Sequence, residues 1–367
     1  MYAAGSNSCA QLGIGGYDDF SRLVQCRTRT GLFPPAGQVV QLASNSRGTI
    51  AIVRDGHKLS LWTCGMMLGN SDTFEEVAIS TLISAVSCVG DYAPVHITAA
   101  WDCAHVVLRS ADQKNDLIIA IGSHNEFGQL GIGNEPRPTQ NVHLVILPCK
   151  QVHVTRIAAG MRHIAVAVAS SDGQNIVYGW GDARRGQLGT LPPTVRTAQG
   201  ISRVVHWSPV ITTSSTHCVA ALALGRCNTL VAWDTQPVTV QVFGAAEFDF
   251  DRTPDGLYVV PSFSALGCCW NTAICIAGSP PKVHATGLNN HFQCSGNGIT
   301  VEQPILACGT EHVLVASDKL LAWGWNEHGN LAQGNTEAYD IPVCIMDQRV
   351  CSVFAGCGSS FVQCNAI

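Results

Sequence analysis

Short apolar segments that end in glycine recur along the whole sequence. Their spacing averages about 53 residues, a period typical of propeller blades and unlike that of helical solenoids. Each segment is rich in aromatic or β-branched residues, which predicts one β-strand at each position. The segments are YAAG at Gly5, LWTCG at Gly65, IIAIG at Gly122, VYGWG at Gly181, LVAWD at Asp234, VHATG at Gly287 and LLAWG at Gly324.

Pairs of apolar runs joined by a short turn lie between these strands. Small and β-branched residues on both sides of each turn predict hairpins whose two strands are buried. Together with the glycine-ended strands they predict an all-β fold, a seven-bladed β-propeller of four-stranded antiparallel blades in a single domain over residues 1–367. The pairs are LASNSRGTIAIV, ITAAWDCAHVVL, IAAGMRHIAVAV, ITTSSTHCVAAL, ALGCCWNTAICI, ILACGTEHVLVA and VFAGCGSSFVQC.

The two ends of the sequence carry different parts of the repeat. The sequence starts with a glycine-ended strand, and its last repeat stops after the hairpin VFAGCGSSFVQC. We therefore expect Tyr2 to Gly13 to complete the last blade. Pairing of the N- and C-terminal strands would close the ring and remove exposed sheet edges.

The charge of the chain argues against nucleic acid as a direct partner. Only 13% of the residues are charged and the net charge is -5, so no basic patch or tail is expected to neutralise a phosphate backbone. The opening residues lack a cationic segment followed by an apolar run, and no stretch of about 18 apolar residues occurs. A cytoplasmic protein is therefore expected, with a nuclear fraction left open and no membrane partner.

The 17 cysteines are odd in number and lie inside apolar runs such as GCCWNTAICIAG. This pattern favours reduced, buried thiols that act as small hydrophobic side chains. No CxxC pair occurs, and the adjacent Cys268 and Cys269 would point to opposite sides of a strand. The chain is thus expected to hold no metal and no cofactor of its own.

Histidine recurs in the hairpin turns, at His163, His217 and His312. A histidine that appears once per blade is interpreted as a hydrogen-bonded core group. No G-x-S-x-G, H-E-x-x-H or G-x-x-x-x-G-K-[ST] motif is present, so no enzyme is expected. In the other blades the histidine position is assigned to Gly48, Cys103, Trp270 and Ser359.

These motifs resemble the regulator-of-chromosome-condensation repeat family, whose pattern is an aromatic-Gly strand, a GQLG loop and a G-x-x-H turn. GQLG-like loops occur at Gln11, Gln129 and Gln187. Within the family the chain resembles the small fungal alpha-tubulin suppressor or killer-toxin-insensitivity propellers. The stretches that carry this resemblance are MYAAGSNSCAQLGIG, AAWDCAHVVL, CCWNTAI and WGWNEHGN.

The resemblance implies two alternative functions. The small fungal subgroup implies a non-catalytic adaptor that forms a heterodimer with a CSL-type zinc protein. Such an adaptor would support Elongator-dependent modification of wobble uridine in tRNA and diphthamide synthesis on elongation factor 2, with the zinc held by the partner. The broader family implies guanine-nucleotide exchange on a small GTPase, although the basic tail and β-wedge of those members are not recognised in this sequence.

The predicted contact surface follows from strand topology. In an antiparallel blade, the turn between strands one and two and the loop between strands three and four emerge on the same side. Where large groups interrupt the repeat there, aromatic and charged residues are typical of binding hot spots, although tryptophans could instead fill gaps between blades. Trp62, Trp180 and Trp323, within strands, are expected to be core. The predicted partner-binding residues are Trp270, His291, Glu311, Trp325, Glu327 and His328, with Trp101 and Asp102 in a further turn.

Overall fold

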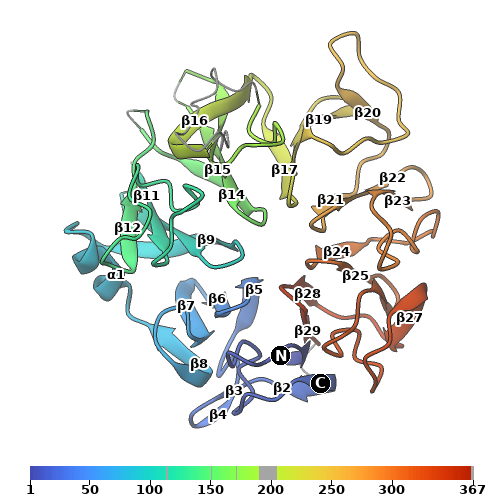
Figure 1. The fold of residues 1–367 in the computed structure, drawn as a ribbon, viewed down its shortest axis with the longest axis horizontal. Coiled ribbons are helices and arrows are strands. Elements are labelled where there is room, and N and C mark those ends of the chain that lie inside the picture. Colours follow the sequence, from blue (N-terminus) through green and yellow to red (C-terminus); the bar gives the residue numbers. More distant parts are fainter. Residues whose placement is uncertain (113–114, 150, 171, 190–204, 365–367) are drawn as a thin grey trace, which may run out of the picture. The chain divides into compact units, whose positions relative to one another are not determined.

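The computed structural model describes residues 1–112, 115–149, 151–170, 172–189 and 205–364. In these ranges the strands form seven antiparallel sheets and one small two-stranded ribbon (Figure 1). The seven sheets confirm the predicted fold class, a seven-bladed β-propeller. The chain divides into two compact units, Met1–Ala78 with Pro261–Ile367 and Ile79–Val260, which are described in turn. The single domain over residues 1–367 stays a prediction.

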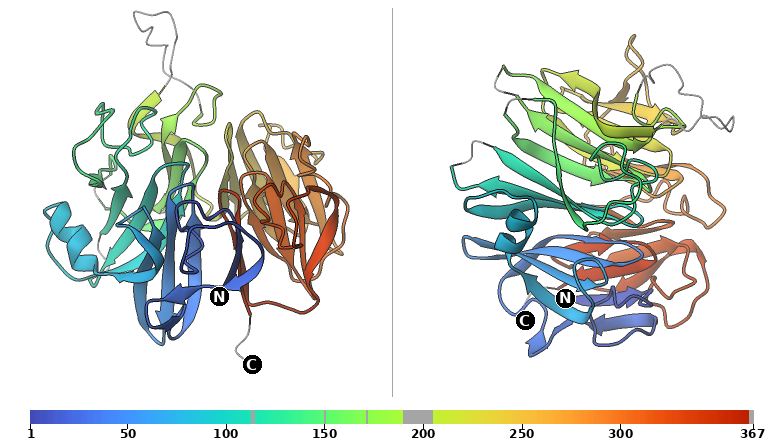
Figure 2. Two further views of the ribbon diagram at one scale, coloured as in Figure 1. Left: turned by 60° about the horizontal axis from the view of Figure 1, so that its bottom comes forward. Right: turned by 60° about the vertical axis from the view of Figure 1, so that its left-hand side comes forward.

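The first unit contains four of the sheets, whose strands can be followed in Figures 1 and 2. One sheet contains strands from both ends of the chain: β28 (Ser352–Ala355), β29 (Ser359–Gln363), β1 (Tyr2–Gly5) and β2 (Phe20–Gln25). The other three are β5 (Gln38–Ser44), β6 (Gly48–Asp55), β7 (Lys58–Gly65) and β8 (Ser71–Val77); β21 (Ala265–Cys268), β22 (Thr272–Ala277) and β23 (Lys282–Gly287); and β24 (Ile305–Cys308), β25 (His312–Ala316), β26 (Leu320–Gly324) and β27 (Tyr339–Met346). The ribbon consists of β3 (Arg27–Thr28) and β4 (Gly31–Leu32).

The terminal strands pair as the sequence predicts. In the β1–β29 ladder Tyr2 lies opposite Val362 and Gly5 opposite Ser359, and β2 pairs with the other edge of β1. Gly5 has a φ of 112°, and a Cβ atom there would lie 2.1 Å from the carbonyl oxygen of Gly358. Only glycine fits this strand end without strain. The opening stretch therefore completes the last sheet, as expected.

The sheet formed by β21, β22 and β23 differs from the four-stranded prediction. At its outer edge only a single bridge joins Lys282 to Thr300. The backbone of Val283 instead exchanges hydrogen bonds with the loop residues Gly298 and Ile299, at 2.8 Å and 3.0 Å. The loop thus satisfies the polar groups of this edge without forming a regular fourth strand.

The second unit contains three four-stranded sheets and the helix α1 (Ile79–Ala85). Within the described residues, no helix combines the length and the apolar character needed to cross a membrane. The first two sheets are β9 (Tyr92–Ala99), β10 (Ala104–Ser110), β11 (Asp116–Ile121) and β12 (Val142–Val145); and β13 (Val154–Ala159), β14 (His163–Ala169), β15 (Asn175–Asp182) and β16 (Val205–Ser215). The third is β17 (Val219–Leu224), β18 (Asn228–Trp233), β19 (Val238–Gly244) and β20 (Tyr258–Val260).

The strands of this third sheet were assigned wrongly from the sequence, with each predicted strand displaced by one position in the sheet. The predicted hairpin ITTSSTHCVAAL is divided between the outer strand β16 and the first strand β17. LVAWD lies in the second strand, and the glycine-ended third strand closes at Gly244, whose φ is 101°. The aromatic Trp233 caused the error, because it mimics a third-strand residue from within β18. His217 therefore lies exposed in the β16–β17 connection and not in a repeat turn.

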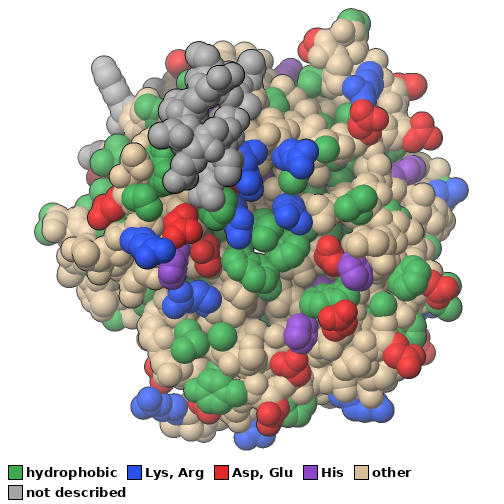
Figure 3. Space-filling view, viewed as in Figure 1, with side chains coloured by type: hydrophobic (Ala, Val, Ile, Leu, Met, Phe, Trp, Pro, Cys, Tyr) green, Lys and Arg blue, Asp and Glu red, His purple; other side chains and the backbone are tan. Residues whose placement is uncertain are grey.

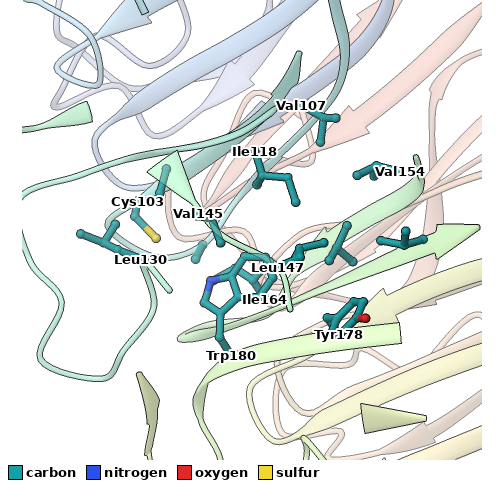
Figure 4. Packing of buried hydrophobic residues seen from close by; sticks show 14 residues of the cluster. Cys103, Val107, Ile118, Leu130, Val145, Leu147, Val154, Ile164, Tyr178 and Trp180 are labelled. Atoms are coloured by element: carbon teal, nitrogen blue, oxygen red, sulfur yellow. The ribbon is translucent and has the colours of Figure 1, made fainter. Parts of the chain in front are cut away.

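Two of the tryptophans predicted to be core are fully buried. Figure 4 shows Trp180 among Cys103, Leu130 and Ile164, which belong to one buried cluster of the second unit. The indole Nε1 of Trp180 donates a hydrogen bond to the carbonyl oxygen of Gln129 at 3.1 Å. In the first unit, Trp323 is 1% exposed and donates to the carbonyl oxygen of Gln293 at 2.8 Å, whereas Trp62 is only half-buried.

Candidate partner-binding site

The seven hairpin turns share one hydrogen-bonded geometry. In each, the N–H of the first residue donates to the carbonyl oxygen of the fourth, as Gly309 does to His312 at 2.9 Å and Cys269 to Thr272 at 2.8 Å. Thr272 therefore holds the histidine position of its turn, and the assignment of Trp270 to that position is wrong. Trp270 is the second residue of the turn, a place where a large side chain remains partly exposed. The residues at the fourth position are Gly48, Cys103, His163, Asn228, Thr272, His312 and Ser359.

Of the three histidines predicted to be buried hydrogen-bonding groups, His163 and His312 are confirmed and the exposed His217 is not. His163 Nε2 lies 3.0 Å from the hydroxyl oxygen of Thr229, and burial lowers the pKa of His163 to about 4. Burial likewise lowers the pKa of His312 to about 4. Both imidazoles are thus neutral near neutral pH and enclosed by protein, which suits a structural role better than proton transfer.

The glutamines of the GQLG loops hold the loop backbone. The side-chain oxygen of Gln129 accepts the N–H of Phe127 at 2.9 Å, and the Asn125 side-chain oxygen accepts the N–H of Leu130 at 2.9 Å. The same glutamine contact occurs at Gln11, Gln187 and Gln293. The recurrence of asparagine and glutamine in these loops is therefore explained by loop geometry.

A pair of side chains joins two neighbouring sheets of the first unit. His291, in the loop after β23, places Nε2 3.1 Å from Oε2 of Glu311 in the β24–β25 turn. Beside this pair, the N–H of Trp270 donates to the carbonyl oxygen of Thr310 at 2.7 Å. The side chains of His291 and Glu311 keep 34% and 18% of their surface exposed, so the pair remains open to a partner.

A second group lies in the loop after β26. The rings of Trp325 and His328 meet edge to face with centroids 5.2 Å apart, and His328 Nδ1 lies 2.6 Å from Oδ2 of Asp19. A Cβ atom added to Gly358 would lie within 3.2 Å of both rings, so together they cover that turn. Asp19 was missed by the sequence reasoning. It lies 309 positions from His328 in the sequence, and no repeat motif marks it.

One hydrogen bond joins these two groups, because the N–H of Trp325 donates to the carbonyl oxygen of Glu311 at 3.0 Å. Glu327 is exposed in the same loop. Over β24, β25 and β28, Figure 3 shows histidine and acidic side chains next to one another. The acidic-histidine surface is defined as Asp19, Trp270, His291, Glu311, Trp325, Glu327 and His328.

Trp101 and Asp102 lie in the β9–β10 turn of the second unit, apart in the chain from the other predicted residues. Trp101 is 36% exposed, and its N–H donates to the carbonyl oxygen of Met161 at 3.1 Å. Burial raises the pKa of Asp102, and Nε2 of Gln129 donates to its carboxylate at 3.3 Å. Their inclusion in one surface with the first-unit residues stays a prediction.

A metal site in the described part of the chain would need a cluster of possible ligands. There, no three histidine, cysteine, aspartate or glutamate side chains gather closely enough to hold an ion. What the acidic-histidine surface can offer is aromatic area, hydrogen bonds and negative charge, which are the properties of a protein-binding surface.

Comparison with known proteins agrees with the repeat pattern. Residues 317–363 match the family model "Regulator of chromosome condensation (RCC1) repeat". The chain is 25% identical over 416 residues to the secretion-regulating guanine nucleotide exchange factor of Mus musculus, covering 100% of this chain and 83% of the relative. An RCC1 repeat-containing protein of Schizosaccharomyces pombe is 24% identical over 272 residues, covering 73% of this chain and 72% of the relative.

Two solved structures have the same fold. Prp20p of Saccharomyces cerevisiae, described with its binding to Gsp1p and histones, has a TM-score of 0.70 at 15% identity and covers 98% of this chain and 90% of its own. Human WBSCR16 has a TM-score of 0.69 at 14% identity and covers 100% of this chain and 99% of its own. At these identities the likeness supports the fold alone.

The expectation that the chain is not an enzyme is contradicted by these relatives. The mouse relative and one from Bos taurus are named guanine nucleotide exchange factors, which catalyse nucleotide exchange on GTPases. Nucleotide exchange needs none of the nucleophile, metal-ligand or phosphate-loop motifs, because an exchange catalyst acts through its contacts with another protein. The fold, the match at residues 317–363 and the relatives that match over most of the chain together confirm the resemblance of this chain to the RCC1-repeat family.

Proposed function

We propose that this propeller binds a small GTPase and accelerates release of its guanine nucleotide. The observation that supports this most is the likeness to the secretion-regulating guanine nucleotide exchange factor of mouse, which extends over 100% of this chain. Prp20p, which shares the fold, is described as binding Gsp1p. A protein-binding surface and an exchange activity are compatible, because exchange requires only that the GTPase without nucleotide is bound more tightly than the loaded one.

The acidic-histidine surface is the proposed contact with the GTPase. Guanine-nucleotide phosphates are held by cationic groups and a magnesium ion. A carboxylate brought close to such a site competes with the phosphates for those cations, and Glu327 is exposed in a loop that packing of Trp325 and His328 holds in place. Glu311 is less suited to this role, because it is already paired with His291.

A nucleotide-release assay tests the proposal. Small GTPases loaded with a fluorescent guanine nucleotide are mixed with the purified chain and an excess of unlabelled nucleotide. We expect release from at least one GTPase to accelerate about tenfold or more, a change in barrier of about 1.4 kcal/mol. Glu327→Gln should reduce the acceleration, whereas Glu302→Gln, at another exposed glutamate of the same unit, should not. A folded chain that accelerates none of the GTPases contradicts the proposal.

The adaptor function remains a second proposal, based on the sequence motifs alone. In it the same surface would bind a CSL-type zinc protein, and the pair would act with Elongator in wobble-uridine modification and in diphthamide synthesis. Affinity purification of the tagged chain followed by mass spectrometry separates the two functions. Recovery of a small zinc protein supports the adaptor, and recovery of a GTPase supports exchange. Imaging of the same tagged chain tests the proposed cytoplasmic and nuclear location.

A further inference from the structure

Hydrogen bonds align the hairpin turns of the second unit. The N–H of Trp101 donates to the carbonyl oxygen of Met161, and the N–H of Met161 donates to that of Gly225, each at 3.1 Å. The turns that begin at Ala100, Gly160 and Gly225 therefore follow one another directly. Two of them carry an arginine that is at least partly exposed, Arg162 and Arg226.

Two guanidinium groups in this region lie over one aromatic ring. Arg162 Cζ is 4.0 Å from the ring centroid of Phe127, and Arg184 Cζ is 5.5 Å from it. The loop that carries Arg184 is attached to the same turn, because the N–H of Asp182 donates to the carbonyl oxygen of Arg162 at 2.8 Å. Stacking on an aromatic face orients a planar guanidinium and reduces the freedom it would lose on binding.

The acidic groups near these arginines do not dominate the exposed charge. Asp182 forms two-point hydrogen bonds with Arg184, but its side chain is only 8% exposed against 44% for the arginine. Burial raises the pKa of Asp102, and Glu126 is engaged by Arg137 at 3.2 Å. The outward-facing charge is therefore mainly positive, and Figure 3 shows Lys or Arg side chains gathered over the region of β14 and β17.

We infer that this arginine surface, defined as Trp101, Phe127, Arg162, Arg184 and Arg226, binds an acidic segment of a protein partner. Arginine forms paired hydrogen bonds with carboxylates, and arginine and aromatic side chains are over-represented among residues that dominate binding energy. The surface belongs to the second unit and is separate in sequence from the proposed GTPase contact. The inference does not depend on exchange activity.

An acidic protein segment fits this surface better than nucleic acid does. Binding to a phosphate backbone is driven mainly by lysine and arginine side chains that neutralise phosphates, so the electrostatic affinity grows with the number of such contacts. Here three arginines form the cluster, and the net charge of the chain is -5. The overall field repels a polyanion, whereas a short segment with a few carboxylates can be recognised locally.

Fluorescence anisotropy with a defined probe tests the inference. The probe is a short fluorescein-labelled peptide of alternating glutamate and serine, compared with the same peptide carrying lysine and with a single-stranded oligonucleotide. We expect the glutamate peptide to bind, more weakly as salt is raised. Arg162→Glu and Arg226→Glu should each lower the affinity for the glutamate peptide about tenfold or more. Arg54→Glu should leave this affinity within about twofold of the wild type. Arg54 is an exposed arginine near the far end of β6 in the other unit and serves as the matched charge control.

Two further variants separate binding from folding. Arg226→Gln removes the charge of an exposed side chain. It should weaken binding of the glutamate peptide while leaving the melting temperature unchanged. Arg162→Lys keeps the charge but not the planar stacking group, and should weaken binding less than Arg162→Glu. The inference is overturned if both reversal variants bind the glutamate peptide as Arg54→Glu does. It is also overturned if the oligonucleotide binds more tightly than the glutamate peptide and the same variants abolish that binding. Because the assay contains no GTPase, its failure is distinct from a failure of the proposed function.

Discussion

The Nε2 atom of His312 lies 3.0 Å from the hydroxyl oxygen of Ser360 in the next sheet of the first unit. His163 and Thr229 repeat this relationship in the second unit at the same distance. In both places an imidazole at the start of a second strand bonds to a hydroxyl on the second strand of the following sheet. The repeat histidine therefore links one blade to the next through a buried hydrogen bond. Such a bond is stronger in the protein interior than at the surface.

Acidification should destabilise the fold through these histidines. Burial lowers the pKa of His312 from the ordinary 6.5 to about 4, so the unfolded chain takes up a proton below pH 6.5 that the folded chain accepts only near pH 4. The unfolding free energy therefore falls as pH drops from about 6.5 to about 4, by roughly 2 kcal/mol per histidine between pH 7 and pH 5. Urea unfolding at both pH values measures this loss.

The variant His312→Gln isolates the contribution of this residue. It keeps a hydrogen-bonding side chain near Ser360 but cannot take up a proton in this range. We expect its unfolding free energy to be lower than that of the wild type at pH 7 and to change by about 2 kcal/mol less between pH 7 and pH 5. An identical pH dependence in wild type and variant would show that His312 is not the titrating group.

Trp270→Ala should affect binding more than stability. If the half-buried indole is an anchor for the partner, its removal costs on the order of 2 kcal/mol or more in binding, which is about thirtyfold in affinity. The control is Trp323→Ala, at a residue that is 1% exposed, where about 3–5 kcal/mol of stability should be lost. Melting temperature and partner affinity are measured on both variants. A Trp270→Ala protein that melts far earlier but binds normally when kept cold and folded would contradict the anchor role.

Deletion of residues 1–13 removes only one short strand, but it should lower the stability of the fold substantially. Without β1, both β29 and β2 lose their hydrogen-bonded neighbour, and the buried side chain of Leu12 is lost as well. We expect the melting temperature to fall by more than about 10 °C. Thermal unfolding followed by circular dichroism measures the change, with Tyr17→Ala, at a side chain that is 51% exposed, as the control. An unchanged melting temperature in the truncated chain would refute the role assigned to β1.

The reactivity of the thiols should decrease as their burial increases. Burial raises the pKa of Cys26, Cys275 and Cys357 to about 12, so these thiols carry almost no nucleophilic thiolate near neutral pH. Cys218 and Cys344 are exposed and should be alkylated first in a brief treatment of the native protein, as read by mass spectrometry. Elemental analysis of the same sample should find no stoichiometric zinc. Early labelling of Cys275, or one zinc ion per chain, would contradict this prediction.

Much of the fold could be predicted because each blade repeats a local pattern. A strand-ending glycine is needed wherever the third strand passes close to the hairpin turn, as Gly5 does at Gly358. This steric requirement leaves a regular mark in the sequence, and so does the demand for a paired edge that joins β1 to β29. The prediction failed in the third sheet of the second unit, because Trp233 in β18 imitates the aromatic residue of a third strand.

The binding surfaces were only partly predictable. The pairing of His291 with Glu311 depends on two loops from different sheets, so shared position on a face could suggest it but not establish the distance. Asp19 was missed because its partner His328 lies 309 positions away. Composition likewise predicted no basic patch, since an average over the chain cannot show that Arg162 and Arg184 gather on one phenylalanine ring.

Pairing of β1 with β29 also bears on how the chain is synthesised. Val362, which lies opposite Tyr2, is added to the growing chain some 360 residues after it. Until then the edge of β1 that β29 covers stays unpaired, and exposed strand edges favour aggregation and recognition by chaperones. A polypeptide that stops short of β29 can never bury this edge. Such a polypeptide is thus distinguished from chains that contain β29 by one unpaired strand edge.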